Sequence, residues 1–348
     1  MTALAALIWS VDEIRVSTAG AEFRLGMRMD SAERYGLRLI AAEAGTLFLC
    51  GDASTQLLWR SCDCGRTFEP LPPVPIERER LASRAFKVHR ASATVTALGH
   101  RQLWTYAEGA DRWGSRELPQ DLQVRDVGFD EAGGLWCAGS VRSRRIPDEE
   151  TEAAVRYQAL VGTAFQSRSP RLSPLDAVKV VKAGGLAEFR TVDAEAEPVV
   201  VTSICSWLLD DSSSFVFLLT PERAHVKRLK GEMVCLVDRS QPDVVRVFTH
   251  QGGVWVTRRG SWQRYSMAGP LAKSLMVEDD RILVRGLDVR AQRIAAAVEV
   301  RPIGAGDVAQ DPEFTAVCTS ADGGRSFEVE SRLGFEGGVE IQGVAWIG

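Results

Sequence analysis

The octets SCDCGRTF at residues 61–68 and SADGGRSF at residues 320–327 share one pattern, and this pattern decides the fold. In both, serine, aspartate and glycine alternate with variable residues, and Thr or Ser followed by Phe ends the octet. Short apolar runs typical of β-strands lie on either side of each octet. The aspartate can accept hydrogen bonds from the amides of its own turn, and the glycine tolerates a positive φ. Each octet therefore predicts a tight turn between two β-strands.

This pattern resembles the Asp-box repeat, also called the BNR repeat, of sialidases, sortilin-type receptors and photosystem assembly propellers. In that family the box is the hairpin between the two outer strands of a β-propeller blade, with the aromatic residue packed under the turn. The resemblance covers the two octets and implies a structural role for ten residues: Ser61, Asp63, Gly65, Thr67, Phe68, Ser320, Asp322, Gly324, Ser326 and Phe327.

A looser pattern also indicates repeated sheets. A glycine turn followed by an aliphatic and an aromatic residue occurs in GTLF at 45–48, GGLW at 133–136 and GGVW at 252–255. The first two copies are separated by two units of about 44 residues, which lies within the period of propeller blades. We expect each glycine turn to join an inner strand to the next strand outward.

Most of the remaining chain consists of short apolar runs bounded by turn residues, and helical periodicity is scarce. The stretch Asp148–Leu160 is nearest to a helix, and Glu77–Phe86 is a weaker second. We therefore predict an all-β fold, a single β-propeller domain over residues 1–348 with a helical or loop insertion around 141–175. About seven blades of mostly four strands are expected, with six and eight as the alternatives.

Six of the predicted blades are continuous in sequence, although the fifth looks short for four strands. The seventh combines Thr2–Met27 with Val339–Gly348, so that the N-terminal and C-terminal strands pair and close the ring. Pairing the two ends would satisfy edges that otherwise promote aggregation. The six continuous blades are Leu37–Leu71, Ala85–Leu118, Val124–Arg190, Val199–Val237, Val244–Met267 and Ala272–Glu330.

Charge and composition exclude several classes of partner. The 42 basic and 46 acidic residues give a net charge of −4, without the clustered positive charge that nucleic acids or anionic membranes require. No apolar run approaches the ~18 residues of a membrane helix, and the N-terminus lacks the features of a signal peptide. An odd number of cysteines without a secretory signal favours a reducing compartment. We expect a cytoplasmic protein with no nucleic-acid or membrane partner.

Neither a metal site nor a cofactor site is predicted. Cys62 and Cys64 form a Cys-x-Cys pair, but they fill variable positions of the turn and no cluster of Cys or His accompanies them. The four histidines are His89, His100, His225 and His250, and their spacing is not that of metal ligands.

A sialidase is the obvious enzyme on such a scaffold. Sialidases use a tyrosine nucleophile, and the resemblance implies a carboxylate beside it, an arginine cluster, and a Phe/Tyr-Arg-Ile-Pro segment ahead of the first box. The nearest string, RRIP at 144–147, follows the first box and lacks the aromatic residue. Nucleophile elbows, phosphate loops and dinucleotide fingerprints are absent from the sequence. We therefore assign no catalytic residue.

The leading hypothesis is a non-enzymatic propeller that binds another protein, as a scaffold, an assembly factor or an inhibitor of its partner. The alternatives are a sialidase-like glycoside hydrolase and a small-molecule-binding propeller that uses the central pocket. Arginines that converge around a tyrosine–carboxylate pair would favour the enzyme, whereas a surface of ordinary interface size would favour the scaffold.

Overall fold

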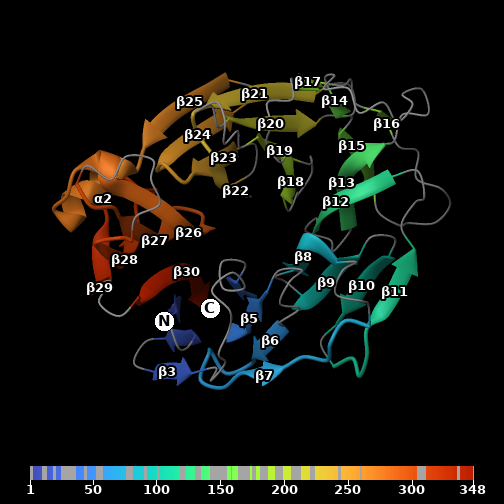
Figure 1. Ribbon diagram of the computed structural model, residues 1–348, viewed down its shortest axis with the longest axis horizontal. Coiled ribbons are helices and arrows are strands. Elements are labelled where there is room, and N and C mark those ends of the chain that lie inside the picture. The colour runs from blue at the N-terminus through green and yellow to red at the C-terminus, as the bar shows by residue number, and fades with distance from the viewer. Residues whose placement is uncertain are drawn as a thin grey trace. The chain divides into compact units, whose positions relative to one another are not determined.

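The computed structural model is nearly all β-strand in the residues that it describes (Figure 1). No helix among these residues is long and apolar enough to cross a membrane. The described residues are 3–9, 14–18, 21–24, 37–42, 45–51, 58–75, 81–89, 92–99, 102–107, 109–117, 122–129, 135–141, 155–157, 159–163, 173–174, 178–180, 187–192, 199–204, 213–219, 224–241, 244–258, 261–303, 311–334 and 338–347.

The chain divides into two compact units. Unit 1 comprises Met1–Pro75, Arg90–Thr94 and Cys235–Gly348, and unit 2 comprises Ile76–His89 and Val95–Val234. Both units are built from four-stranded antiparallel sheets in which strands adjacent in sequence are mostly adjacent in space. Such sheets are the building blocks of propeller blades.

The described residues of unit 1 form four of these sheets. The terminal sheet has the order β3–β2–β1–β30, from β1 (Ala3–Trp9), β2 (Ile14–Thr18), β3 (Ala21–Arg24) and β30 (Glu340–Ile347). The first-box sheet is formed by β4 (Arg38–Ala41), β5 (Leu47–Cys50), β6 (Leu58–Ser61) and β7 (Glu69–Pro70). The second-box sheet is formed by β26 (Ile282–Arg290), β27 (Arg293–Val300), β28 (Phe314–Ser320) and β29 (Glu328–Gly334). The fourth is formed by β22 (Val234–Gln241), β23 (Val244–Thr249), β24 (Gly253–Arg258) and β25 (Ser261–Ser266).

Unit 2 has three four-stranded sheets and one two-stranded sheet among its described residues. The first comprises β8 (Leu81–His89), β9 (Thr94–Gly99), β10 (Gln102–Tyr106) and β11 (Gly114–Glu117). The second comprises β12 (Leu122–Phe129), β13 (Leu135–Val141), β15 (Ala159–Thr163) and β16 (Ser173–Pro174). The third comprises β18 (Ala187–Val192), β19 (Val199–Ile204), β20 (Ser213–Leu219) and β21 (Ala224–Lys230). The two-stranded sheet pairs β14 (Val155–Tyr157) with β17 (Val178–Val180).

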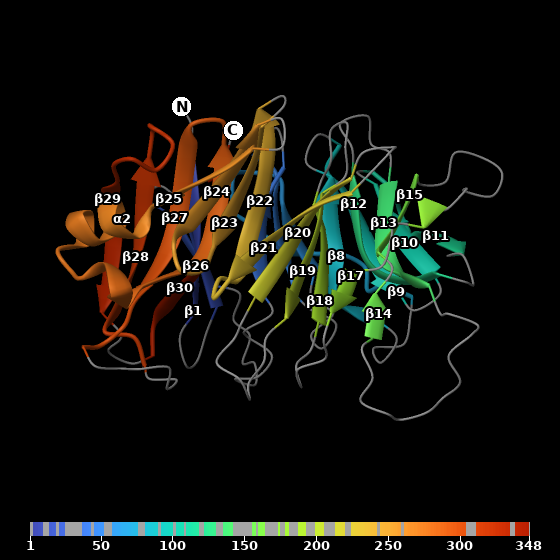
Figure 2. The same ribbon diagram turned by 90° about the horizontal axis from the view of Figure 1, so that it is seen from above.

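The two ends of the chain meet in the terminal sheet. β1 pairs antiparallel with β30, from Ala3 opposite Ile347 to Trp9 opposite Glu340. Figure 2 shows both termini at the same edge of unit 1. The predicted pairing of the N-terminal and C-terminal strands is therefore present. The number of blades and the closure of the ring stay predictions.

The core of unit 1 lies between its sheets. One cluster joins β1, β2, β4, β5 and β30, and another joins β22–β28 with the helix α2 (Ala268–Leu275). β26 and β30, which each lie at one end of the strand order of their sheets, approach each other closely at Gly286. A Cβ there would lie 3.0 Å from the Gly343 Cα and 3.1 Å from the Gln342 carbonyl oxygen. This close approach requires glycine at position 286.

Two predicted blade boundaries are wrong. The predicted blade Val244–Met267 lacks β22, the first strand of its sheet, and the predicted blade Val199–Val237 takes in the first half of that strand. Likewise β18 begins a sheet of unit 2, although Val124–Arg190 had included most of it. A short polar turn has the same residue types whether it joins strands within one sheet or between two sheets, so the turns alone did not locate these boundaries.

The glycine–aromatic pattern marks two different turns. GTLF and GGLW lead into β5 and β13, each the second strand of its sheet. GGVW instead leads into β24, the third strand of its sheet. The three copies therefore lie at turns between successive strands, but at different positions within their sheets.

The helical readings are also corrected. Residues 155–157 and 159–163 are strands, and so are residues 81–89. β-Branched or aromatic residues at 155, 157 and 161 favour the alternating pattern of a strand over the helical one. The rest of Asp148–Leu160, before residue 155, lies outside the described residues.

The sequence reading missed the helix α2. Its eight residues are too few for a clear helical period, and Gly269 and Pro270 resemble a turn. Proline is tolerated in the first turn of a helix because no backbone donor is needed there. The helix buries Leu271 and Leu275 on one face and is followed by the 3-10 turn η3 (Asp279–Arg281).

Candidate functional site

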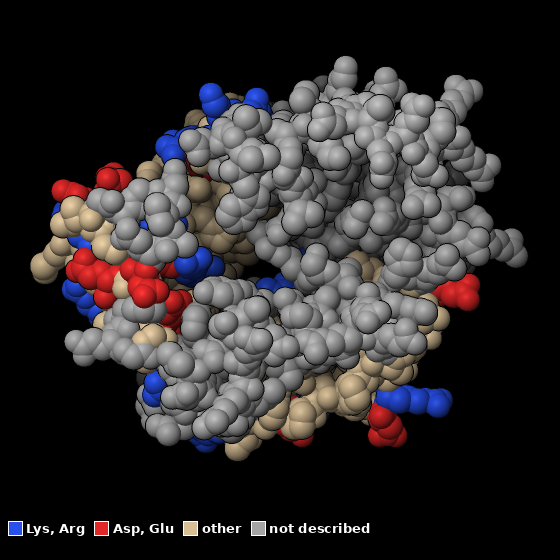
Figure 3. Space-filling model, in the orientation of Figure 1, with Lys and Arg blue, Asp and Glu red and all other residues tan. Residues whose placement is uncertain are grey.

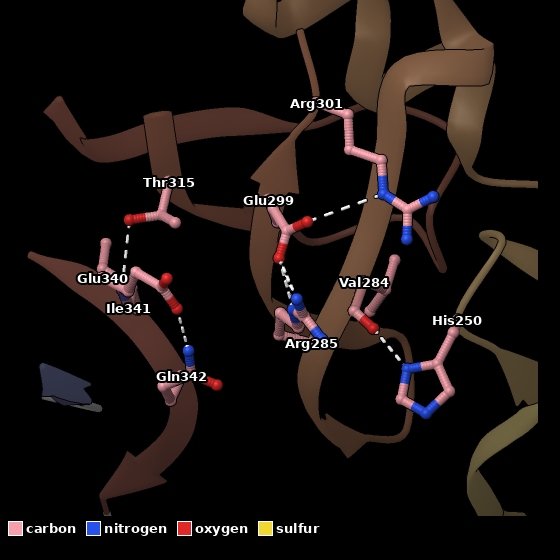
Figure 4. Close-up of polar contacts among 9 residues, drawn as sticks. All are labelled: His250, Val284, Arg285, Glu299, Arg301, Thr315, Glu340, Ile341 and Gln342. Atoms are coloured by element: carbon pink, nitrogen blue, oxygen red, sulfur yellow. Dashed lines mark hydrogen bonds and ion pairs between the residues drawn. The ribbon is translucent and has the colours of Figure 1, made fainter. Parts of the chain in front are cut away.

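A cluster of buried carboxylates and half-exposed arginines lies where β26 and β30 begin (Figure 4). Glu299, near the end of β27, is 2% exposed, and Glu340, the first residue of β30, is 8% exposed. Arg285 Nε donates to Glu299 Oε2 at 2.5 Å, and Arg301 Nε lies 3.6 Å from Glu299 Oε1. Each carboxylate oxygen of Glu299 therefore faces a different guanidinium group.

A β-bulge gives Arg285 its position. The register of β26 against β27 shifts between Val284 and Gly286, so Arg285 has no directly opposite residue. Bulges re-aim side chains in this way. The Arg285 and Arg301 side chains are 37% and 39% exposed. Both retain N–H donors that have no partner among the described residues, so the cluster presents positive charge above a buried carboxylate.

Glu340 has a shifted protonation equilibrium. Burial raises its pKa above the usual value, the Arg285 guanidinium lowers it, and the Glu299 charge raises it. The Gln342 side-chain amide donates a hydrogen bond to Glu340 Oε2. Glu340 therefore accepts a proton more readily than an exposed glutamate.

Backbone hydrogen bonds hold the cluster in place. His250 Nδ1 lies 2.6 Å from the Val284 carbonyl oxygen, and the Val284 amide donates to the His250 carbonyl at 2.8 Å. The Ile341 amide donates to Thr315 Oγ1 at 3.0 Å. These contacts tie the first residues of β26 and β30 to neighbouring strands (Figure 4).

Two large apolar side chains are exposed on the segments that precede β26 and follow β27. Met276, just after α2, is 92% exposed, and Ile303, just after β27, is 80% exposed. Arg281 links the two segments, because its Nε donates to the Arg301 carbonyl at 2.7 Å and another of its nitrogens donates to Glu313. Figure 3 shows acidic and basic side chains gathered over the part of unit 1 that carries α2. We call Met276, Arg285, Arg301 and Ile303 the mixed surface.

The two Asp-box octets have matching hydrogen bonds. Asp63 Oδ1 accepts from the amides of Arg66 and Thr67, both at 2.9 Å, and Oδ2 accepts from Thr67 Oγ1 at 2.6 Å. Asp322 accepts equivalent bonds at 2.9, 3.0 and 2.7 Å. Ser61 Oγ accepts from the Gly65 amide at 2.8 Å, as Ser320 Oγ does from the Gly324 amide at 2.9 Å.

Both octets lie between the third and fourth strands of a sheet. Gly65 and Gly324 have φ values of 84° and 90°, and Phe68 and Phe327 are buried in the core of unit 1. Each turn also contacts the turn between the first two strands. The Cys64 amide donates to the Gly45 carbonyl at 3.2 Å, and the Gly323 amide donates to the Gln292 carbonyl at 2.8 Å. A structural role and Asp-box membership stay predictions for these residues.

We expect Asp63→Ala to lower the melting temperature at pH 7. The loss leaves two amides and the hydroxyls of Ser61 and Thr67 without their acceptor, and because the turn lies at the surface the cost is about 1 kcal/mol. Asp322→Ala acts in the same direction. Neither substitution should remove partner binding, so a variant that melts normally but no longer binds would contradict the structural role.

This stabilisation depends on pH. The Thr67 hydroxyl and then the Thr67 amide lower the pKa of Asp63 to about 2. A folded-state pKa below the unfolded value of about 4 means that the contribution is complete above pH 4 and is lost as the pH falls through about 2. The difference in melting temperature between wild type and Asp63→Ala should therefore shrink between pH 5 and pH 2.

The described cysteines and histidines form no metal site. Cys62 and Cys64 are exposed, and no group of three or more His, Cys, Asp or Glu among the described residues could hold a metal ion. His89 is half-buried, and His250 is in the backbone hydrogen bond given above. The side chains of His100 and His225 lie outside the described residues.

The described tyrosines do not form the sialidase arrangement. Tyr265 donates its hydroxyl to the Gly323 carbonyl at 3.3 Å, and burial raises its pKa. The nearby Arg246 is buried and pairs with Asp238 at 2.8 Å, from Nε to Oδ2. Tyr106 packs against Trp113. Tyr35, the Tyr157 side chain and the RRIP string lie outside the described residues.

Solved structures similar to this chain are β-propeller proteins. Apo AztD from Citrobacter koseri is 12% identical with a TM-score of 0.51, and the match covers 100% of this chain and 99% of AztD. A quinoprotein alcohol dehydrogenase-like protein from Bacteroides thetaiotaomicron is 10% identical with a TM-score of 0.51, over 98% of this chain and 78% of that protein. The chain has a β-propeller fold. At these identities the likeness shows the fold alone.

No protein-family model matches the chain, and no curated protein matches its sequence. No matching family thus marks the mixed surface, and its residues are identified from the structure alone. Sequence reasoning had singled out none of its residues. The available signal was a charged residue inside an apolar strand, as in ILVRGL at 282–287 and AAAVEV at 295–300.

Proposed function

We propose that the chain is a non-enzymatic β-propeller that binds another protein through the mixed surface. The observation that carries this proposal is the pair of half-exposed arginines held over buried Glu299, together with the exposed Met276 and Ile303 on the segments that precede β26 and follow β27. Arginine and methionine are enriched at protein interfaces, and arginine is frequent among residues that dominate binding energy. We further propose that residues 1–348 form one closed, cytoplasmic propeller domain of seven blades, with an insertion around 141–175.

The arrangement suits a partner segment that carries a carboxylate next to an apolar side chain. Glu299 holds both guanidinium groups in place, so less conformational entropy is lost when they bind. Their remaining donors match the planar geometry of a carboxylate. Met276 and Ile303 add apolar area beside the charges. Scaffolding, assembly and inhibition of the partner are the three roles that this proposal covers, and all three begin with the same contact.

The test is affinity purification of the tagged full-length chain from its native cell, with three matched baits. Wild type and Arg112→Ala, which removes an exposed arginine in unit 2, should retain the same partner. Arg301→Ala combined with Ile303→Ser should lose that partner while keeping the wild-type melting temperature. A partner retained equally by all three baits would contradict the proposed surface, and so would the absence of any protein that wild type retains.

A carbohydrate-active enzyme is the second candidate, and one observation favours it. Glu340 has a raised pKa and lies close enough to Glu299 to feel its charge, and such pairs serve as acid and base in glycosidases. Hydrolysis of a fluorogenic sialoside or glycoside by wild type, abolished in Glu340→Gln, would favour this enzyme over the scaffold.

A further inference from the structure

The first Asp-box octet carries two exposed thiols. Cys62 and Cys64 lie two positions apart in the turn between β6 and β7, and both are free and exposed. Cysteine is among the residue types that are most often buried, and a free thiol at the surface is open to reaction. Two exposed cysteines in one turn therefore need a chemical explanation.

The turn itself does not require cysteine at either position. The second octet has Ala321 and Gly323 at the matching positions, and Asp322 accepts the same set of hydrogen bonds there. The φ values are 76° at Gly323 and 61° at Cys64, in a region that glycine adopts most easily. Glycine would thus suit position 64 at least as well as cysteine. The turn accounts for the shared positions of the octets and leaves the two thiols unexplained.

The spacing of Cys62 and Cys64 allows a bond between them. The two Cα atoms of a disulfide are usually about 4.4–6.8 Å apart. Residues two positions apart are separated by about 6.6 Å even in an extended strand, and a turn brings them closer. The backbone of the octet is therefore compatible with a disulfide that spans Asp63.

The other described cysteines are protected from thiol chemistry. Burial raises the pKa of the Cys50 and Cys318 thiols to about 12. Cys235 is half-buried, and its sulfur donates to the Phe248 carbonyl at 3.4 Å. The thiolate is the reactive form, and an accessible cysteine next to a second one is typical of redox-sensing sites. Among the described residues, the pair in the first octet alone combines exposure with a neighbouring thiol.

We propose that Cys62 and Cys64 form a reversible dithiol–disulfide site that reacts with small-molecule disulfides such as glutathione disulfide. One cysteine thiolate attacks a sulfur of the small disulfide, which gives a mixed disulfide and releases one small thiol. The second cysteine attacks the protein-bound sulfur, closes the internal disulfide and releases the second small thiol. Two electrons pass from the cysteines to the oxidant, and the two cysteine protons end on the two released thiols. The site shares no residue with the mixed surface and does not depend on the proposed function.

The test treats the folded full-length chain with excess glutathione disulfide, blocks the remaining thiols and maps the tryptic peptides by mass spectrometry. Cleavage after Arg60 and Arg66 releases residues 61–66, which hold both cysteines of the octet and no other. In wild type this peptide should become lighter by two hydrogens, and dithiothreitol should restore it. Its oxidation should be at least about 100-fold faster than reaction of Cys50 or Cys318, because those thiols are buried.

Cys62→Ser and Cys64→Ser are the matched single variants. With one thiol left, each should stop at the mixed disulfide, and residues 61–66 should then carry glutathione in place of the internal bond. The proposal is overturned if wild type accumulates only the glutathione adduct, or if the pair reacts no faster than the buried cysteines.

A double variant tests whether the cysteines only stabilise the turn. Cys62→Ala combined with Cys64→Gly copies the second octet at both positions. Cys64 Sγ lies against Gly45, because a Cβ on Gly45 would be 2.6 Å from it. The double variant should nevertheless melt as reduced wild type does, since glycine suits the backbone at position 64. A markedly lower melting temperature would assign the two cysteines to packing of the turn and would contradict the proposal.

Discussion

Removal of residues 339–348 should yield a chain that does not fold to a soluble monomer. The deletion takes away β30, which pairs with β1 from end to end and also packs against β4 and β26. Ile341, Trp346 and Ile347 are buried, and burial of three such side chains contributes about 5–9 kcal/mol. That is comparable to the whole stability of a typical domain. The deletion also leaves β1 with an unpaired edge, which promotes aggregation.

The measurement is the soluble fraction and the size-exclusion profile of the truncated chain. Ile341→Asp in the full-length chain is a second variant, since it keeps the strand but buries a charge in the core of unit 1. It should lower the melting temperature strongly. A truncated chain that stays monomeric and melts as wild type does would show that β30 is dispensable.

We expect Arg246→Leu to lower the free energy of unfolding by about 3–5 kcal/mol. Arg246 on β23 and Asp238 on β22 are both buried, and the guanidinium contacts Asp238 Oδ2 through Nε at 2.8 Å and through a second nitrogen at 2.6 Å. The same side chain donates to the Ala291 carbonyl between β26 and β27. The substitution therefore takes the Arg246 cation away from a buried carboxylate and removes a link between two sheets. Urea denaturation measures the effect.

The control is the double substitution Arg246→Leu and Asp238→Leu. Replacing both members of a buried ion pair by apolar residues is often close to neutral. The double variant should therefore recover most of the stability that the single variant loses. A double variant as unstable as Arg246→Leu would contradict this account, because the loss would then not come from the separation of Asp238 from Arg246.

The turns could be predicted from the sequence because their interactions are local. The partners of Asp63 and the Gly65 amide bond to Ser61 lie within the same eight residues, so the octet contains the hydrogen bonds that shape its own turn. The pairing of β1 with β30 was also predictable, since each end of the chain is an apolar run that needs a partner. The boundaries between sheets were less accessible, because β22 and β18 are separated from their neighbours by ordinary turns.

The mixed surface could not be predicted because it depends on register. Arg285 and Glu299 are 14 residues apart and meet only because β26 pairs with β27 and bulges at Arg285. Glu340 joins them from β30, which lies against β26 through the close approach at Gly286. Sequence patterns specify strands and turns, whereas this surface arises from the packing of one sheet on another.

Hydrogen exchange of the native protein, read segment by segment, tests most directly the claim that both ends of the chain build one sheet. Amides in β30 should exchange as slowly as those in β1 and β26, because opening the last strand requires unfolding of the sheets around it. Protection of all three strands should also be lost together on mild denaturation. Rapid exchange of residues 340–347 while β1 and β26 remain protected would contradict the account.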